Sequence, residues 1–118
     1  MIKEKAILKT ITDSILEKKG KEIVVINLSS IKYAFCDYFV ICHGESSTQV
    51  SALAESVEEK VKEKHGLTRG HVEGLQNAQW ILIDYSNIVV HIFQKEYRDY
   101  YKLEDLWGDA HISIIEED

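Results

Sequence analysis

The segment from Trp80 to Phe93 constrains the fold most, because it has the pattern of a β-hairpin. It reads Trp-Ile-Leu-Ile-Asp-Tyr-Ser-Asn-Ile-Val-Val-His-Ile-Phe, with an apolar run on each side of Ser86 and Asn87. A two-residue turn there pairs Tyr85 with Ile88, and every residue outward from them in register.

The two faces of this hairpin differ in chemistry. Directly opposite residues share a face, and successive residues alternate between faces. The aliphatic face, which suits a core, pairs Ile81 with Ile92, Ile83 with Val90 and Tyr85 with Ile88. The mixed face pairs Trp80 with Phe93, Leu82 with His91 and Asp84 with Val89. This second face suits contact with a partner, or with the chain's own C-terminal helix through Tyr100 or Trp107.

Apolar spacing places the other elements. Residues 7–16 have helical periodicity that ends at Gly20, and residues 23–28 and 38–42 are apolar strand candidates. A second helix begins at Ser46, which has the capping-box spacing to Gln49, or at Ser47, and it ends at Gly66.

The remaining segments are less regular. Residues 67–77 contain two glycines and predict irregular structure, and residues 96–107 predict one or two short helices. Residues 112–115 are apolar, and we expect a late strand or a frayed end. The order of elements predicts an α/β fold, a single domain over residues 1–118 with a mixed sheet flanked by helices, because a strand–helix–strand step favours a parallel pair.

Composition narrows the class of protein. The 118 residues are 45% hydrophobic and carry a net charge of -6, which argues against broad binding to nucleic-acid phosphates and allows a basic protein partner. Cys36 and Cys42 match no zinc or redox spacing, so reduced thiols are expected. No signal, transit or membrane-spanning segment is evident, and we expect a soluble, cytoplasmic protein.

A catalytic interpretation is possible at residues 44–47, Gly-Glu-Ser-Ser. A glycine between a strand and a helix can admit a phosphate, as in nucleotidyltransferases, which add paired carboxylates for magnesium. Here Asp84 has no second acid two residues on. A capped helix start is therefore the preferred interpretation.

The five histidines and two cysteines predict neither a metal site nor a cysteine nucleophile. No two histidines have the spacing of a zinc motif, and His43 should point away from Cys42 because they are strand neighbours. We expect no catalytic residue, no metal and no cofactor.

Five segments of the chain form a recognisable set in this order and spacing. They are Cys36-Asp37-Tyr38-Phe39-Val40-Ile41-Cys42-His43-Gly44-Glu45-Ser46-Ser47, Val72-Glu73-Gly74, Trp80-Ile81-Leu82-Ile83-Asp84-Tyr85, Val89-Val90-His91-Ile92-Phe93 and Tyr101-Lys102-Leu103-Glu104-Asp105-Leu106-Trp107. Through these motifs the chain resembles the ribosomal silencing factor family, also called the Iojap-like family. The resemblance runs in order from about Ile7 to Ala110 and leaves residues 111–118 as an acidic tail.

The resemblance implies a nucleotidyltransferase-like fold without the catalytic carboxylates. It also implies a function: binding the large ribosomal subunit through its protein L-fourteen, blocking association with the small subunit and so repressing translation. Large-subunit assembly and a homodimer of the free protein are further implications. The family often has Gly-Asp where this chain has Ser86-Asn87, and Asn87 is the better suited of the two to a positive φ.

Strand alternation then predicts which residues meet the ribosomal protein. We expect the interface to comprise Trp80, Leu82, Asp84, His91 and Phe93, with Trp80 and Phe93 as apolar anchors. Arg98 and Tyr101 are expected at its rim. Two alternatives stay open: an active nucleotidyltransferase-like enzyme that binds nucleotide near Gly44 and Asp84, and a generic homodimerisation module.

Overall fold

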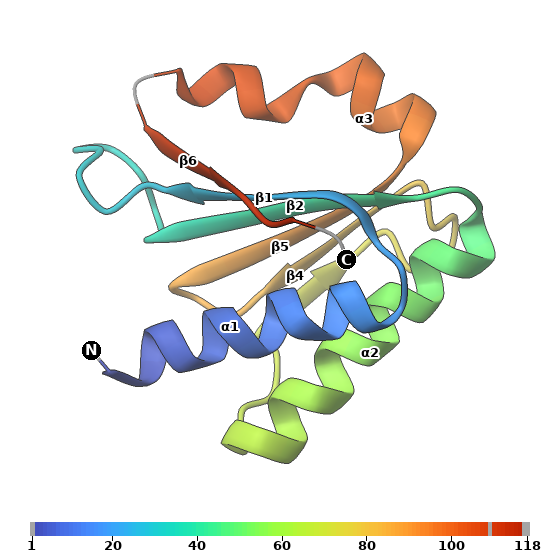
Figure 1. Ribbon diagram of the computed structural model, residues 1–118, viewed down its shortest axis with the longest axis horizontal. Helices are drawn as coiled ribbons and strands as arrows, with labels where there is room; N and C mark the ends of the chain where they lie inside the picture. Colours follow the sequence, from blue (N-terminus) through green and yellow to red (C-terminus); the bar gives the residue numbers. More distant parts are fainter. Residues whose placement is uncertain (1, 109, 117–118) are drawn as a thin grey trace.

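A mixed sheet organises the chain, and helices cover both of its faces (Figure 1). The computed structural model describes residues 2–108 and 110–116, with side chains described from Glu4 onward. The elements in chain order are α1 (Ile2–Glu17), β1 (Lys21–Asn27), β2 (Tyr38–Gly44), α2 (Ser47–His65), β3 (His71–Glu73), β4 (Trp80–Asp84), β5 (Ile88–Gln94), α3 (Lys95–Tyr101), η1 (Leu103–Trp107) and β6 (His111–Ile114).

The strand order within the described residues is β3-β4-β5-β2-β1-β6. Strand β5 lies parallel to β2, while the pairs β3–β4, β4–β5, β1–β2 and β1–β6 are antiparallel. The expected mixed sheet and its parallel pair are thus confirmed. Strand β3 was not predicted, because its three residues include one apolar side chain, Val72, too few to show an alternating pattern.

The predicted hairpin register is confirmed, with Trp80 opposite Phe93, Leu82 opposite His91 and Asp84 opposite Val89. The turn differs from expectation, because Ser86 and not Asn87 has a positive φ, at 77°. An Asp84 carboxylate oxygen accepts the Ser86 N–H at 2.6 Å, and the Tyr85 carbonyl accepts the Asn87 N–H at 3.0 Å. The bond between Asn87 and Tyr85 closes a γ-turn centred on Ser86, and the bond from Ser86 to the Asp84 side chain forms an Asx-turn before it.

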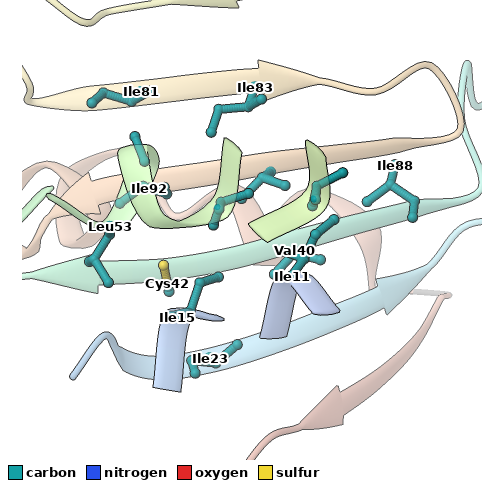
Figure 2. Close-up of a cluster of buried hydrophobic side chains, with 14 of the residues drawn as sticks. Ile11, Ile15, Ile23, Val40, Cys42, Leu53, Ile81, Ile83, Ile88 and Ile92 are labelled. Carbon is teal, nitrogen blue, oxygen red and sulfur yellow. The ribbon is translucent and has the colours of Figure 1, made fainter. Parts of the chain in front are cut away.

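Helices α1 and α2 cover the aliphatic face of the sheet. Figure 2 shows side chains of the core that lies between these helices and the strands. Ile11, Ile15 and Leu53 come from the two helices and are fully buried against the strands. The predicted caps of α2 are present: the Ser46 hydroxyl accepts the Gln49 N–H at 3.1 Å, and Gly66 adopts a φ of 64°. The Gln49 side chain accepts from Glu45 N–H at 2.7 Å, one residue before the position that a capping box predicts.

The opposite face of the sheet lies beneath α3 and η1, at the top of Figure 1. The mixed face of the hairpin is therefore largely covered by the chain's own C-terminal helices, which settles an alternative that the sequence left open. The second core on this side contains Ile26, Leu28, Cys36, Phe39, Ile41 and Phe93, with Trp80, Tyr97, Leu103 and Trp107 packed against it.

The C-terminal segment forms an edge strand. Residues of β6 pair with β1, with Ser113 opposite Val25 and His111 opposite Asn27, so of the two possibilities for the apolar tail, a late strand or a frayed end, the structure has the strand. Among the described helices, none combines the length and the apolar character needed to cross a membrane.

Candidate protein interface

Trp80, the first residue of β4, lies among aromatic rings of β5 and α3. Its indole stacks on Phe93 with ring centroids 4.8 Å apart and an interplanar angle of 28°. Tyr101, at the end of α3, contacts it with a centroid distance of 4.9 Å. Trp80 thus keeps part of its surface exposed while two rings hold its plane in place, the arrangement of an anchor residue in a protein interface.

His91 lies beneath this indole and fixes it further. Nε1–H of Trp80 donates to Nδ1 of His91 at 3.1 Å. Burial lowers the pKa of His91 to about 4, so the ring is neutral at pH 7. Because Nδ1 is the acceptor, the ring proton belongs on Nε2, which is buried and has no hydrogen-bond partner.

The five residues predicted for the interface divide by exposure. Trp80, Leu82 and Asp84 are half-buried, whereas His91 is 3% exposed and Phe93 has no exposed surface. The role of Phe93 as an apolar anchor is therefore corrected: in this conformation His91 and Phe93 can act on a partner only by holding Trp80. Alternation along a strand predicts which residues share a face, as the register confirms, but it cannot show that α3 lies over part of that face.

The two residues predicted for the rim also lie differently. Tyr101 is 48% exposed and contacts Trp80 directly, so it lies beside the anchor. We name the group formed by the partly exposed Trp80, Leu82 and Asp84 and the exposed Tyr101 the Trp80 surface. Arg98 is only 6% exposed, and this burial removes it from the rim.

Arg98 instead fastens α3 and η1 to the sheet. Its Nε and Nη2 donate to one carboxylate oxygen of Glu104 at 3.2 and 2.9 Å. Its Nη1 lies 3.0 Å from Nδ1 of His43 and 3.3 Å from the carbonyl oxygen of Lys21. Burial and the adjacent guanidinium both lower the pKa of His43, which leaves its ring neutral and able to accept from Arg98. Arg98 thereby positions the helix that carries Tyr101.

The segment considered for catalysis, residues 44–47, is a capped helix start. The Glu45 N–H would have to donate to a bound phosphate, but it donates to the side-chain oxygen of Gln49. Cys42 is fully buried in the helix-covered core, and burial raises the pKa of its thiol to about 12, while His43 points to the other face toward Arg98. Across residues 4–108 and 110–116, no three His, Cys, Asp or Glu side chains are grouped as a metal site would require.

The fold and the Trp80 surface define a single-domain mixed α/β protein that presents a small aromatic contact area. The family model described as "Ribosomal silencing factor during starvation" matches residues 2–118. The chain belongs to this ribosomal silencing factor family.

Individual relatives agree with this assignment. The chain is 40% identical over 104 residues to "Ribosomal silencing factor RsfS" of Halalkalibacterium halodurans, which covers 88% of this chain and 87% of that protein. It is 37% identical to the protein of the same name in Bacillus subtilis, over 96% of this chain and 94% of that one. A crystal structure of a protein from Chromobacterium violaceum superposes with a TM-score of 0.83 at 35% identity, over 88% of this chain and 85% of that one.

A more distant relative carries a different name. The mouse protein "Mitochondrial assembly of ribosomal large subunit protein 1" is 28% identical over 93 residues, which cover 77% of this chain and 40% of that protein. This name associates that relative with assembly of the large ribosomal subunit.

Proposed function

We propose that this protein is a cytoplasmic ribosomal silencing factor that binds the large subunit and represses translation without catalysis. The names of its relatives support the ribosomal role, and the mouse relative supports the choice of the large subunit. The partner that the family resemblance implies is protein L-fourteen, on the face that meets the small subunit. A protein bound there blocks subunit association by occupying the surface.

The geometry of Trp80 carries this proposal. Its indole is partly exposed, and three neighbours, Phe93, Tyr101 and His91, hold it in one orientation. An anchor that is rigid before binding loses little conformational entropy when a partner covers it. Leu82 extends the apolar area along the same face of β4. Asp84 at the hairpin end supplies a carboxylate for a basic partner, which the net charge of -6 also favours.

Co-sedimentation tests the proposal. The protein should pellet with isolated large subunits and fail to pellet with intact ribosomes, because the joined small subunit covers the binding face. Equal pelleting with both would contradict the steric mechanism. The fraction of protein bound should also fall when purified L-fourteen is added as a competitor.

A homodimer of the free protein is a second use of the same surface. Exposed aromatic area on Tyr100 and Tyr101, 79% and 48% exposed, adjoins Trp80 and favours self-association at high concentration. Light scattering at several concentrations measures it. If the dimer uses the Trp80 surface, large subunits should dissociate it; a dimer that stays intact on the subunit would place self-association elsewhere.

A further inference from the structure

A second surface lies on the other side of the sheet. Helix α1 covers the face formed by β1 and β2, and β6 extends the sheet past it. The alternating residues His111, Ser113 and Ile115 of the C-terminal segment therefore line the space beside the helix. This space is a cavity of about 520 Å³, within the range of small-molecule sites.

The lining of this cavity, here named the α1–β6 cavity, is apolar at its base and polar at its edge. Val25 is 7% exposed and forms the base with the partly buried Leu8 and Ile115. The polar lining residues are Lys5, Lys9, Thr12, Asp13, Asn27, Tyr38, His111 and Ser113. A ligand for such a site needs an apolar body and a polar head.

The charges indicate the sign of that head. The chain is acidic as a whole, yet among the residues that the structure describes two lysines and one carboxylate line this cavity. Lys9 pairs with that carboxylate, Asp13, at 3.1 Å. Within the described part of the chain, the Lys5 ammonium has neither a hydrogen-bond acceptor nor an ion-pair partner. It is a cation in reach of the cavity and available to an anion.

Groups near Lys5 also favour an anionic head group. Burial and the nearby Asp37 carboxyl raise the pKa of Glu4, the acid that precedes Lys5 in the chain. A raised pKa favours the uncharged form of this carboxyl. The side chains of Tyr38 and Ser113, which line the cavity with Lys5, also form no hydrogen bond within residues 4–108 and 110–116.

We propose that the α1–β6 cavity binds a small amphipathic anion, with its apolar chain against Val25, Leu8 and Ile115 and its acidic head at Lys5 and His111. The ligand class is an organic carboxylate or an organic phosphate monoester, since both offer an anionic head on an apolar body. The site lies on the face of the sheet that α1 and α2 cover, whereas the Trp80 surface lies on the face beneath α3 and η1. This inference is therefore independent of the ribosomal role.

Octanoate is a suitable probe, with octyl phosphate as the second head group and octanol and octylamine as the neutral and cationic controls. Titration of the isotope-labelled protein, followed by amide NMR, should give saturable shifts confined to α1, β1 and β6 with octanoate or octyl phosphate. The tighter of the two anions identifies the head group. No saturable shift with either anion at millimolar concentration, or equal shifts with octanol, would overturn the proposal.

Two variants and one control locate the site. Lys5→Ala should weaken octanoate binding about five-fold, the size of one partly screened charge contact, whereas Lys18→Ala at the exposed end of α1 should not change it. Ser113→Leu narrows the cavity without altering charge and should weaken binding in a protein whose other amide signals are unchanged. Unaltered binding in both variants would contradict the site. So would a dimer, seen by light scattering, whose interface covers α1 and β6 and excludes octanoate.

Discussion

The indole N–H of Trp80 donates a 3.1 Å hydrogen bond to Nδ1 of His91, so a buried imidazole sets the orientation of a partly exposed indole. His91→Phe keeps an aromatic ring in that place but removes the acceptor. We expect its affinity for the large subunit to fall several-fold while the fold persists. His91→Gln can still accept the indole proton and should recover part of the loss. Pelleting measures affinity, and Trp80 fluorescence reports the change around the indole.

Stability in this variant separates positioning from folding. His91 leaves a buried Nε2–H without a partner, which costs about 1–3 kcal/mol in the native state. His91→Phe should therefore be nearly as stable as the parent in urea unfolding. A large loss of stability would show that His91 serves the core and not the orientation of Trp80.

The buried imidazole also predicts a pH dependence of stability. Burial lowers the pKa of His91 to about 4 from 6.5, so the unfolded state takes up this proton first as the pH falls. Above pH 6.5 the ring is neutral in both states, and its contribution to the free energy of unfolding is fully present. As the pH falls from 6.5 through about 4, the unfolded state binds the proton before the folded state does. The free energy of unfolding therefore decreases by at most on the order of 3 kcal/mol. His43, whose pKa is also lowered, acts in the same direction.

Carboxylates titrate over part of the same range, so the measurement is a comparison. Urea unfolding at several pH values between 7 and 4 should show a shallower loss in His91→Phe than in the parent protein. Parallel curves would mean that His91 is protonated in the folded state at the same pH as in the unfolded state.

Arg98 should be among the most sensitive positions for stability. Arg98→Met removes the ion-pair partner of Glu104, whose side chain is 26% exposed, and removes the hydrogen bond from Nη1 to the Lys21 carbonyl. The expected loss is about 3–5 kcal/mol in urea unfolding. Arg98→Lys should recover little of it, since one ammonium cannot reach three elements at once. Lys95→Met, on the same helix, removes an exposed pair with Asp99 and should change unfolding little.

The hairpin turn offers a stabilising change. Ser86 holds a φ of 77°, which a side chain disfavours and glycine does not. Ser86→Gly should raise the free energy of unfolding by about 0.5–1 kcal/mol, reduced somewhat by the greater freedom of glycine in the unfolded chain. Asn87 has no positive φ, so Asn87→Gly relieves no strain and only increases the freedom of the unfolded chain. This change should lower the free energy of unfolding. The reverse order in thermal unfolding would contradict the turn geometry.

Local patterns predicted much of this fold because several elements are encoded by neighbouring residues. The register of β4 and β5, the cap at Ser46 and the stop at Gly66 all follow from short-range chemistry. The positive φ at Ser86 was missed although it is also local, because the Ser86 N–H bonds to the Asp84 side chain two residues earlier and the preference of each residue for positive φ was considered alone. Residue propensity alone cannot anticipate that bond.

The candidate site was predictable only in part. Trp80 was found from alternation along the hairpin, but the burial of Phe93 depends on where α3 lies, a tertiary contact between segments. Arg98 was assigned to the rim because arginine is usually exposed, whereas its acceptors come from β1, β2 and η1. No pattern near residue 98 reveals partners 55 and 77 residues away.

Trp80→Ala tests the proposed anchor. Truncation of a central aromatic anchor costs on the order of 2 kcal/mol of binding free energy, about a thirty-fold loss of affinity for the large subunit. Tyr33→Ala is a matched control, since Tyr33 is an aromatic residue 85% exposed in the loop before β2. Retained affinity in a folded Trp80→Ala protein would move the interface elsewhere.

Subunit joining measured by light scattering tests the central claim most directly. The protein should lower the joined fraction in proportion to the large subunits that it occupies. Trp80→Ala at the same concentration should leave joining nearly unchanged, and Tyr33→Ala should act like the parent protein. If the parent protein saturates the large subunit and joining proceeds at its normal rate and extent, the steric account is contradicted.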